Sequence, residues 1–240
     1  MATPDVSNTV KLFEVATGKE VGSHTVNQLG HLFPLSDGKF LVLDRSENTL
    51  RLWDIASHQL VGTIAGVSNL SSIPSLSPDS KLAAIGDFQG DVLIWPLAPG
   101  DRVRKLFGHT DAIGRISFSP DGRVLVSSSS DNTAKLLDVT TLSEIATLRG
   151  HSGWVQSASF SPDGKTLATT SMDGTAKFWN AESYRELLTL PGHIAPFSEI
   201  TFTGDQNTLL CRGEDGLLCL WRAPSFAELD AAQKAQALAK

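Results

Sequence analysis

Short apolar runs separated by turn residues follow one another along most of this chain. Between residues 108 and 149, the runs lie at 115–119, 124–128, 134–139 and 144–148. Pro-Asp-Gly and Asp-Asn sequences separate the first three runs, and such residues form tight turns between antiparallel strands. The segment therefore predicts a four-stranded antiparallel sheet. A helical spacing of apolar positions occurs only near the C-terminus.

The same arrangement repeats with a period of 42 residues. Turn aspartates recur in this register at Asp37, Asp79, Asp121, Asp163 and Asp205. A large apolar residue follows each turn by 16 residues, at Trp53, Trp95, Leu137, Trp179 and Trp221. Gly-His pairs share the period at Gly108-His109, Gly150-His151 and Gly192-His193. Because both faces of such a sheet are apolar, consecutive sheets must pack on one another, and this repeat predicts the blades of a β-propeller.

Composition agrees with a turn-rich all-β chain and narrows its function. An apolar fraction of 41% can fill a core, whereas a net charge of −6 disfavours nucleic-acid binding. No stretch approaches the roughly 20 apolar residues of a membrane helix, and residues 1–10 lack the features of a signal peptide. Cys211 and Cys219 flank one turn symmetrically, so we expect two reduced thiols facing each other across antiparallel strands. We expect a soluble, cytoplasmic chain with no zinc site and no cofactor.

The chain resembles the WD-repeat β-propellers over about residues 5–222. The repeat at 150–180 shows the resemblance best, through Gly150-His151, Ser161-Pro162-Asp163-Gly164 and Phe178-Trp179-Asn180. The Trp-Asp pair itself is kept only as Trp53-Asp54. The resemblance implies an all-β propeller that presents one rim to protein or peptide partners and has no catalytic residues.

The resemblance also implies a hydrogen-bond network. In it, the turn Asp accepts a hydrogen bond from a His, the His contacts the hydroxyl of a Ser or Thr, and that hydroxyl contacts an indole N–H. The full set is His151, Ser171, Asp173 and Trp179, with Thr169 as the alternative hydroxyl. Partial sets are His109, Ser129 and Asp131 before it, and His193, Asp215 and Trp221 after it. Ser, His and Asp together also fit a catalytic triad. Since an active site is needed once and this set recurs, we interpret it as structural.

We expect four full blades, at 24–65, 66–107, 108–149 and 150–191, and partial blades at both ends. Residues 1–23 align with the last two strands of a blade, and 192–222 with the first three. Residues 223–240 predict a C-terminal helical tail with a capping box at Ser225 and Glu228. In a closed ring of five blades, the strand segments 10–15 and 217–221 would compete for the same position in one blade. We therefore expect the C-terminal arc of a larger propeller, for example one of seven blades.

In the resembled family, side chains at the start of the first strand and just before the turn Asp touch partners. The corresponding candidate rim residues are Leu70, Phe88, Trp154, Gln156, Met172 and Glu214. Aromatic residues and Met are enriched at interface centres, which favours a binding patch. The alternative is that each apolar side chain packs against neighbouring loops.

The residues from Trp221 to Ser225 are similar to the ending of bacterial WD-repeat proteins, some of which follow a Ser/Thr kinase domain. The chain itself has no Gly-rich phosphate loop and no His-Arg-Asp sequence. We expect a non-catalytic interaction scaffold or sensing module of a bacterial signalling protein, with an upstream kinase as one candidate context. Two alternatives are a propeller-type hydrolase, which needs converging metal ligands, and an RNA-binding propeller, which needs a basic surface.

Overall fold

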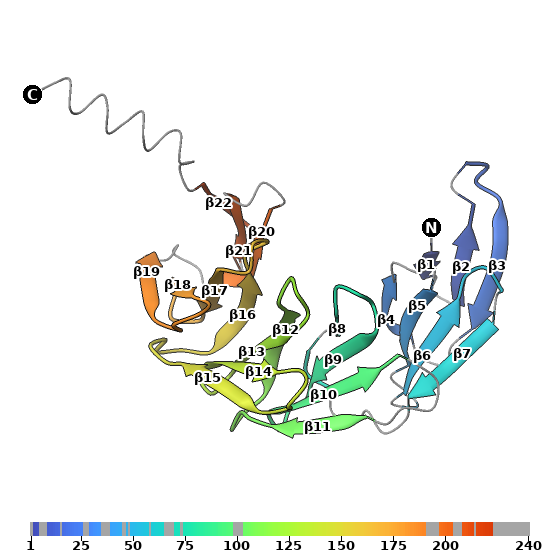
Figure 1. The fold of residues 1–240 in the computed structure, drawn as a ribbon. Helices are drawn as coiled ribbons and strands as arrows, with labels where there is room; N and C mark the ends of the chain where they lie inside the picture. Colours follow the sequence, from blue (N-terminus) through green and yellow to red (C-terminus); the bar gives the residue numbers. More distant parts are fainter. Residues whose placement is uncertain are drawn as a thin grey trace, which may run out of the picture.

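The computed structural model describes residues 2–4, 9–14, 16–25, 29–34, 39–44, 47, 49–57, 59–64, 70–72, 74–97, 103–190, 197–203, 208–213 and 215–222. All regular secondary structure among these residues is β-strand, which confirms the predicted all-β class for this part of the chain (Figure 1). The predicted helical tail at 223–240 lies outside the described residues.

The strands form antiparallel sheets in which only strands consecutive in sequence pair. Four sheets have four strands each in the described part of the chain. The first contains β4 (Leu29–Pro34), β5 (Lys39–Asp44), β6 (Thr49–Asp54) and β7 (Gln59–Ile64), and the second contains β8 (Ser75–Leu76), β9 (Leu82–Gly86), β10 (Asp91–Pro96) and β11 (Arg104–Phe107). The third contains β12 (Ile113–Phe118), β13 (Val124–Ser129), β14 (Ala134–Asp138) and β15 (Glu144–Leu148), and the fourth contains β16 (Val155–Phe160), β17 (Thr166–Ser171), β18 (Ala176–Asn180) and β19 (Glu186–Leu190). Two sheets have three: β1 (Ala2–Pro4), β2 (Thr9–Phe13) and β3 (Glu20–Thr25); β20 (Phe197–Phe202), β21 (Thr208–Gly213) and β22 (Leu218–Arg222).

The first sheet corrects the prediction that residues 1–23 supply only two strands of a blade. Ala2–Pro4 forms a further strand, β1, which pairs with β2 so that Ala2 lies opposite Leu12. Strand β3 extends to Thr25, past the expected boundary at residue 23. Three residues are too few to show an alternation of apolar and polar positions, so the sequence pattern could not reveal β1.

The Ser-Pro-Asp turns owe their regular spacing to a local set of side-chain hydrogen bonds. The Ser119 hydroxyl donates to Asp121 at 2.6 Å, the Arg123 amide donates to Asp121 at 3.1 Å, and the Val124 amide donates to Ser119 Oγ at 3.0 Å. Gly122 has a φ of 73°, which a glycine adopts without strain. The same side-chain bonds recur one repeat earlier and one repeat later. Each turn therefore fixes the start of the second strand in its sheet.

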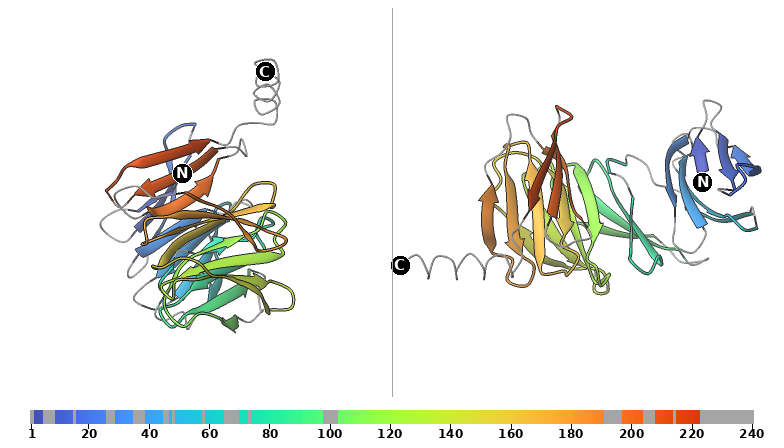
Figure 2. Two further views of the ribbon diagram at one scale, coloured as in Figure 1. Left: turned by 90° about the vertical axis from the view of Figure 1, so that its left-hand side faces the viewer. Right: turned by 90° about the horizontal axis from the view of Figure 1, so that it is seen from above.

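The hydrophobic core lies between neighbouring sheets, which follow one another along an arc with β1–β3 and β20–β22 at its ends (Figures 1 and 2). One buried cluster joins β8–β11 to β12–β15 through residues such as Ile94, Ile113 and Phe118. The next joins β12–β15 to β16–β19 and includes Leu136 and Trp179. Strands β12, β16 and β20 are also neighbours in space. No single sheet could bury these faces alone, so the sheets hold one another in place.

Candidate functional site: a buried network and an exposed rim

The sheet β16–β19 holds a connected set of buried polar side chains. His151 Nδ1 lies 3.0 Å from Asp173 Oδ2, and His151 Nε2 lies 2.8 Å from Thr169 Oγ1. The Trp179 indole N–H donates to the same Thr169 oxygen at 2.9 Å. The Thr175 hydroxyl also donates to Asp173, at 2.7 Å. The network therefore ties the loop before β16 to strands β17 and β18 and to the turn between them.

The preceding sheet, β12–β15, contains a shorter version of this network. His109 contacts Asp131 at 2.9 Å through Nδ1 and Ser127 Oγ at 2.9 Å through Nε2. The Thr133 hydroxyl donates to Asp131 at 2.6 Å. Leu137 stands at the Trp position, is buried, and packs in the apolar cluster between the sheets. The network therefore ends at Ser127 here.

The protonation states of these groups make the hydrogen bonds consistent with one another. Burial lowers the pKa of His109 and His151, although Asp131 and Asp173 oppose this shift. Burial acts to raise the pKa of Asp173, but hydrogen bonds from Thr175 and Ser152 outweigh it and lower the pKa to about 2. A neutral imidazole then donates Nδ1–H to the ionised Asp, while Nε2 accepts from the hydroxyl.

In the β16–β19 network the hydroxyl is the alternative, Thr169, and in the β12–β15 network it differs from the predicted Ser129. Thr169 and Ser127 fill this place, whereas Ser171 and Ser129 donate to the carbonyls of Gly153 and Asp111, at 2.8 and 2.9 Å. Thr169 and Ser171 share one face of β17, so the sequence alternation could not separate them. Trp179 lies opposite Leu167 in the sheet, so Thr169, two residues further along β17, is its diagonal neighbour. Ser171 lies two residues beyond Thr169 and is therefore farther from the indole.

The order of contacts, hydroxyl to His to Asp, is that of a catalytic triad, but the surroundings are those of a core. The Thr169 residue and the side chain of His109 are 0% exposed. The Thr169 hydroxyl oxygen also accepts a hydrogen bond from the Trp179 indole, which fixes the position of the hydroxyl group. No substrate has access to a hydroxyl buried in this way, so the geometry supports the structural interpretation.

Replacing Thr169 by Val should lower the stability to unfolding by about 2–4 kcal/mol. The substitution keeps the shape of the side chain but leaves His151 Nε2 and Trp179 Nε1 without a partner, and each such buried group costs about 1–3 kcal/mol. Thr170→Val is the matched control, because the Thr170 hydroxyl is buried with no hydrogen-bond partner in the described structure. Urea denaturation midpoints check the difference, and equal losses in the two variants would contradict the network.

The sheet β8–β11 replaces this network with a different polar cluster that sequence analysis missed. Ile85 stands at the position of Thr169, and the buried Trp95 Nε1 has no hydrogen-bond partner within the described residues. Asp87 and Asp91 are buried instead, and Lys105 Nζ lies 2.5 Å from Asp91. Comparing positions 42 residues apart could have found the two acids, since Ser129 and Thr133 occupy their places in the next repeat.

The last sheet shows only part of its predicted network. His193 lies outside the described residues. Asp215 is exposed and accepts the Leu217 amide at 3.0 Å. Trp221 is half-buried and packs against the cluster that contains Leu209 and Cys211.

Three of the predicted rim residues lie together at one end of the sheet β16–β19. Trp154 directly precedes β16, Met172 directly follows β17, and the Met172 amide donates to the Trp154 carbonyl at 2.8 Å. The half-buried Gln156 side chain donates to the Met172 sulfur. Trp154 is 56% exposed and Met172 is 38% exposed, so the two apolar side chains face solvent.

The other predicted rim residues differ among themselves. Phe88 follows β9 at the corresponding end of its own sheet and is 60% exposed. Leu70 is half-buried and packs against the core cluster between β4–β7 and β8–β11, so it belongs to the core and not to an open surface. Glu214 lies outside the described residues.

The two cysteines face each other as predicted. Cys211 lies directly opposite Cys219 in the β21–β22 pair, and both are free thiols. Burial raises the pKa of Cys211 to about 12, so this thiol is unreactive. Within the described part of the chain, no group of three or more His, Cys, Asp or Glu residues could hold a metal ion. Among the residues that the structure describes, no helix occurs that could cross a membrane.

Comparison with known proteins supports the repeat assignment. The family described as "WD domain, G-beta repeat" matches residues 100–138 and 142–180, each running from the outer strand of one sheet to the third strand of the next. No curated protein matches the chain. Residues 100–180 thus contain two WD40 repeats, which supports a WD-repeat family for this chain. WD40 repeats generally mediate protein–protein interactions and are typically non-catalytic.

Proposed function

We propose that this chain is a non-catalytic scaffold or sensing module that presents the rim at Trp154, Gln156 and Met172 to a protein or peptide. The observation that supports it most is the 56% exposure of Trp154, a large aromatic side chain on a rigid edge. The loop before Trp154 is held by two bonds, since the Ser152 amide donates to Asp173 and Ser171 donates to the Gly153 carbonyl. A pre-organised aromatic anchor loses little conformational entropy on binding.

The alternatives receive less support from the described structure. A hydrolase would need exposed catalytic groups, whereas the side chains of the two His-Asp pairs are at most 10% exposed. RNA binding would need a basic surface, whereas Lys105, Arg115, Lys135 and Lys177 are engaged in ion pairs with acids. The proposal accordingly includes no catalytic residue, metal, cofactor or nucleic acid.

We place the module in a bacterial signalling protein in the cytoplasm, as part of a propeller with more blades than this chain supplies. The similarity of 221–225 to the ending of bacterial WD-repeat proteins supports the source, and two free thiols fit a reducing compartment. An upstream Ser/Thr kinase domain in the same polypeptide is the candidate context. Sequencing the gene upstream of the Met1 codon tests it, and a stop codon directly upstream would contradict both the larger ring and the kinase.

Replacing Trp154 by Ala should abolish partner binding while leaving the fold intact. An exposed residue contributes little to stability, so the loss should stay below about 1 kcal/mol, whereas truncating an interface anchor should weaken binding at least about tenfold. Wild-type and variant chains serve as paired baits, and quantitative mass spectrometry compares the proteins each recovers. Leu187→Ala, which truncates a residue 58% exposed on the outer strand β19, is the control. A large loss of stability in Trp154→Ala would place the indole in the core and contradict the rim.

A further inference from the structure

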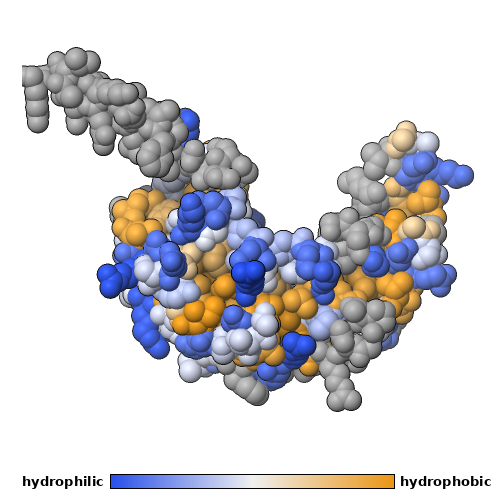
Figure 3. Space-filling model, viewed as in Figure 1, coloured by the Kyte–Doolittle hydropathy of each residue, from blue (hydrophilic) through white to orange (hydrophobic). Residues whose placement is uncertain are grey.

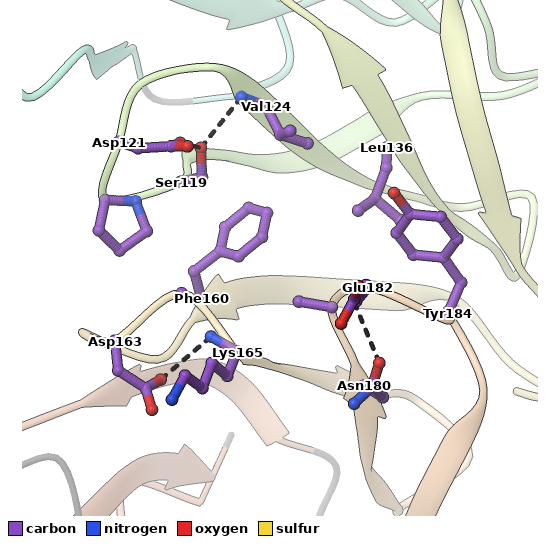
Figure 4. A pocket seen from close by; sticks show the side chains of 13 residues that line it. Ser119, Asp121, Val124, Leu136, Phe160, Asp163, Lys165, Asn180, Glu182 and Tyr184 are labelled. Atoms are coloured by element: carbon purple, nitrogen blue, oxygen red, sulfur yellow. Dashed lines mark hydrogen bonds between the residues drawn. The ribbon is translucent and has the colours of Figure 1, made fainter.

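A second candidate site lies at the opposite end of the same sheets. A cavity of about 540 Å³ opens between β12–β15 and β16–β19 (Figure 4). Phe160, the last residue of β16, lines it, whereas Trp154 precedes the first residue of that strand. About 20 Å of extended chain therefore separates the cavity from the rim, at about 3.3 Å per residue. A volume of this size is typical of ligand-binding pockets.

The inner wall of the cavity is apolar. Phe160 and Tyr184 both direct their rings into the space between the sheets, and Leu136 and Val124 close it on the β12–β15 side (Figure 4). Tyr184 is half-buried and packs against the apolar cluster between the two sheets. Its hydroxyl group makes no hydrogen bond with the other described residues and is not among their buried unpartnered atoms. The wall thus combines apolar surface with one free polar group.

Two residues that line the cavity are smaller than their counterparts one repeat earlier. One repeat earlier, Val139 and Leu82 pack against the cluster between β8–β11 and β12–β15. Ala181 and Val124 occupy these positions at the cavity. At two other positions of this interface the residues are larger, since Trp179 and Tyr184 stand where Leu137 and Leu142 stand one repeat earlier, so side-chain volume is distributed differently between these two sheets.

The opening of the cavity is predominantly acidic. Three carboxylates and one ammonium line it: Asp121, Asp163, Glu182 and Lys165. The Glu182 carboxylate makes no hydrogen bond or ion pair with the described residues. Asp163 uses Oδ1 for the Ser161 hydroxyl and the Lys165 amide, which leaves Oδ2 available. Asp163 and Asp121 lie close enough to Lys165 and Arg123 for charge attraction, so Glu182 supplies the unpaired negative charge beside the apolar wall.

We propose that this cavity is a second docking site, for a peptide segment of a partner that carries an apolar side chain next to a basic one. The apolar side chain fills the space beside Phe160, Tyr184 and Ala181, and the basic group meets Glu182 and Asp163 at the opening. Charge complementarity selects a basic segment over an acidic one. The site is independent of the rim, so the module binds two partners at opposite ends of its sheets.

The single tyrosine of the chain provides a direct reporter. Tyr184 is the only Tyr residue, so ring-labelled tyrosine gives an NMR signal from this cavity alone. The full chain is titrated with the peptide acetyl-Gly-Phe-Lys-Gly-amide up to millimolar concentration. We expect a saturable shift of the Tyr184 signal. The peptides acetyl-Gly-Phe-Glu-Gly-amide and acetyl-Gly-Ala-Lys-Gly-amide should bind at least about tenfold more weakly, because one lacks the charge match and the other the apolar group.

Two variants test the geometry. Ala181→Leu fills the cavity and should weaken the peptide at least about tenfold, while Glu182→Lys reverses an exposed charge and should weaken it severalfold without affecting the fold. Recovery of rim partners by both variants should equal that of the wild type, which separates this site from the proposed rim. No saturable shift with the Phe-Lys peptide, equal binding of the acidic peptide, or unchanged affinity in Glu182→Lys would each overturn the proposal.

Discussion

Replacing Trp179 by Ala should lower the stability to unfolding by about 3–5 kcal/mol, the usual cost of truncating a large buried aromatic residue. Trp179 is 3% exposed and packs with Leu148, Phe160 and Leu167 between two sheets. The change leaves a cavity in this interface and also removes a hydrogen bond to Thr169, so both apolar and polar contacts are lost. Denaturation midpoints in urea measure the effect.

Trp221→Ala is the matched control for this prediction. Trp221 occupies the same position of the repeat, but it is only half-buried and its sheet has three described strands. Less contact area is lost there, so its truncation should cost clearly less. If Trp221→Ala cost as much as Trp179→Ala, burial between two full sheets would not explain the effect.

Replacing Gly90 by Ala should have the second largest effect, a loss of at least about 2 kcal/mol. Gly90 has a φ of +88°, a conformation that costs an L-residue about 1–2 kcal/mol. An added Cβ would lie 2.5 Å from the backbone oxygen of His109, and relieving such an overlap costs a further 1–3 kcal/mol or so. Because the His109 amide donates to the Gly90 carbonyl at 3.1 Å, the displaced segment also carries the network of the next sheet.

Gly122→Ala separates the two contributions in that prediction. Gly122 also has a positive φ, +73°, but the nearest atom to an added Cβ is Pro78 Cδ at 3.4 Å, an ordinary contact. It should therefore cost only the conformational part, about 1–2 kcal/mol. Denaturation midpoints of the two variants are compared, and equal losses would show that the approach of Gly90 to His109 is not tight.

The all-β architecture could be predicted because each repeat contains turns that are stabilised by hydrogen bonds between residues close together in the sequence. The Ser-Pro-Asp turns are held by hydrogen bonds within the turn, as Ser119 and Asp121 show. The regular spacing of the turn aspartates therefore indicates the spacing of the strands. The opposed cysteines followed from the same register, since a turn at Asp215 places Cys211 opposite Cys219. Strand β1 escaped detection because a strand of three residues has no pattern of its own.

The candidate sites were predictable only in part. The sequence indicated that His151, Asp173 and Trp179 share a network, but its hydroxyl was Thr169 and not Ser171, since both lie on one face of β17. Trp154 was predicted at the rim and is exposed, whereas Leu70 at the equivalent position of another repeat packs into the core. The burial of a side chain depends on the side chains that surround it, and these cannot be derived from its position in the repeat alone.

The sequence by itself determined the strands, their turns and the period, because each depends on residues within a few positions of one another. Only the tertiary structure decided which hydroxyl the indole reaches, that Trp95 has no such partner within the described residues, and that a cavity lined by Ala181 and Tyr184 opens between two sheets. These features arise where two sheets or two strands meet at a particular distance. That distance is set by the packing of many side chains together, which no local pattern of residues specifies.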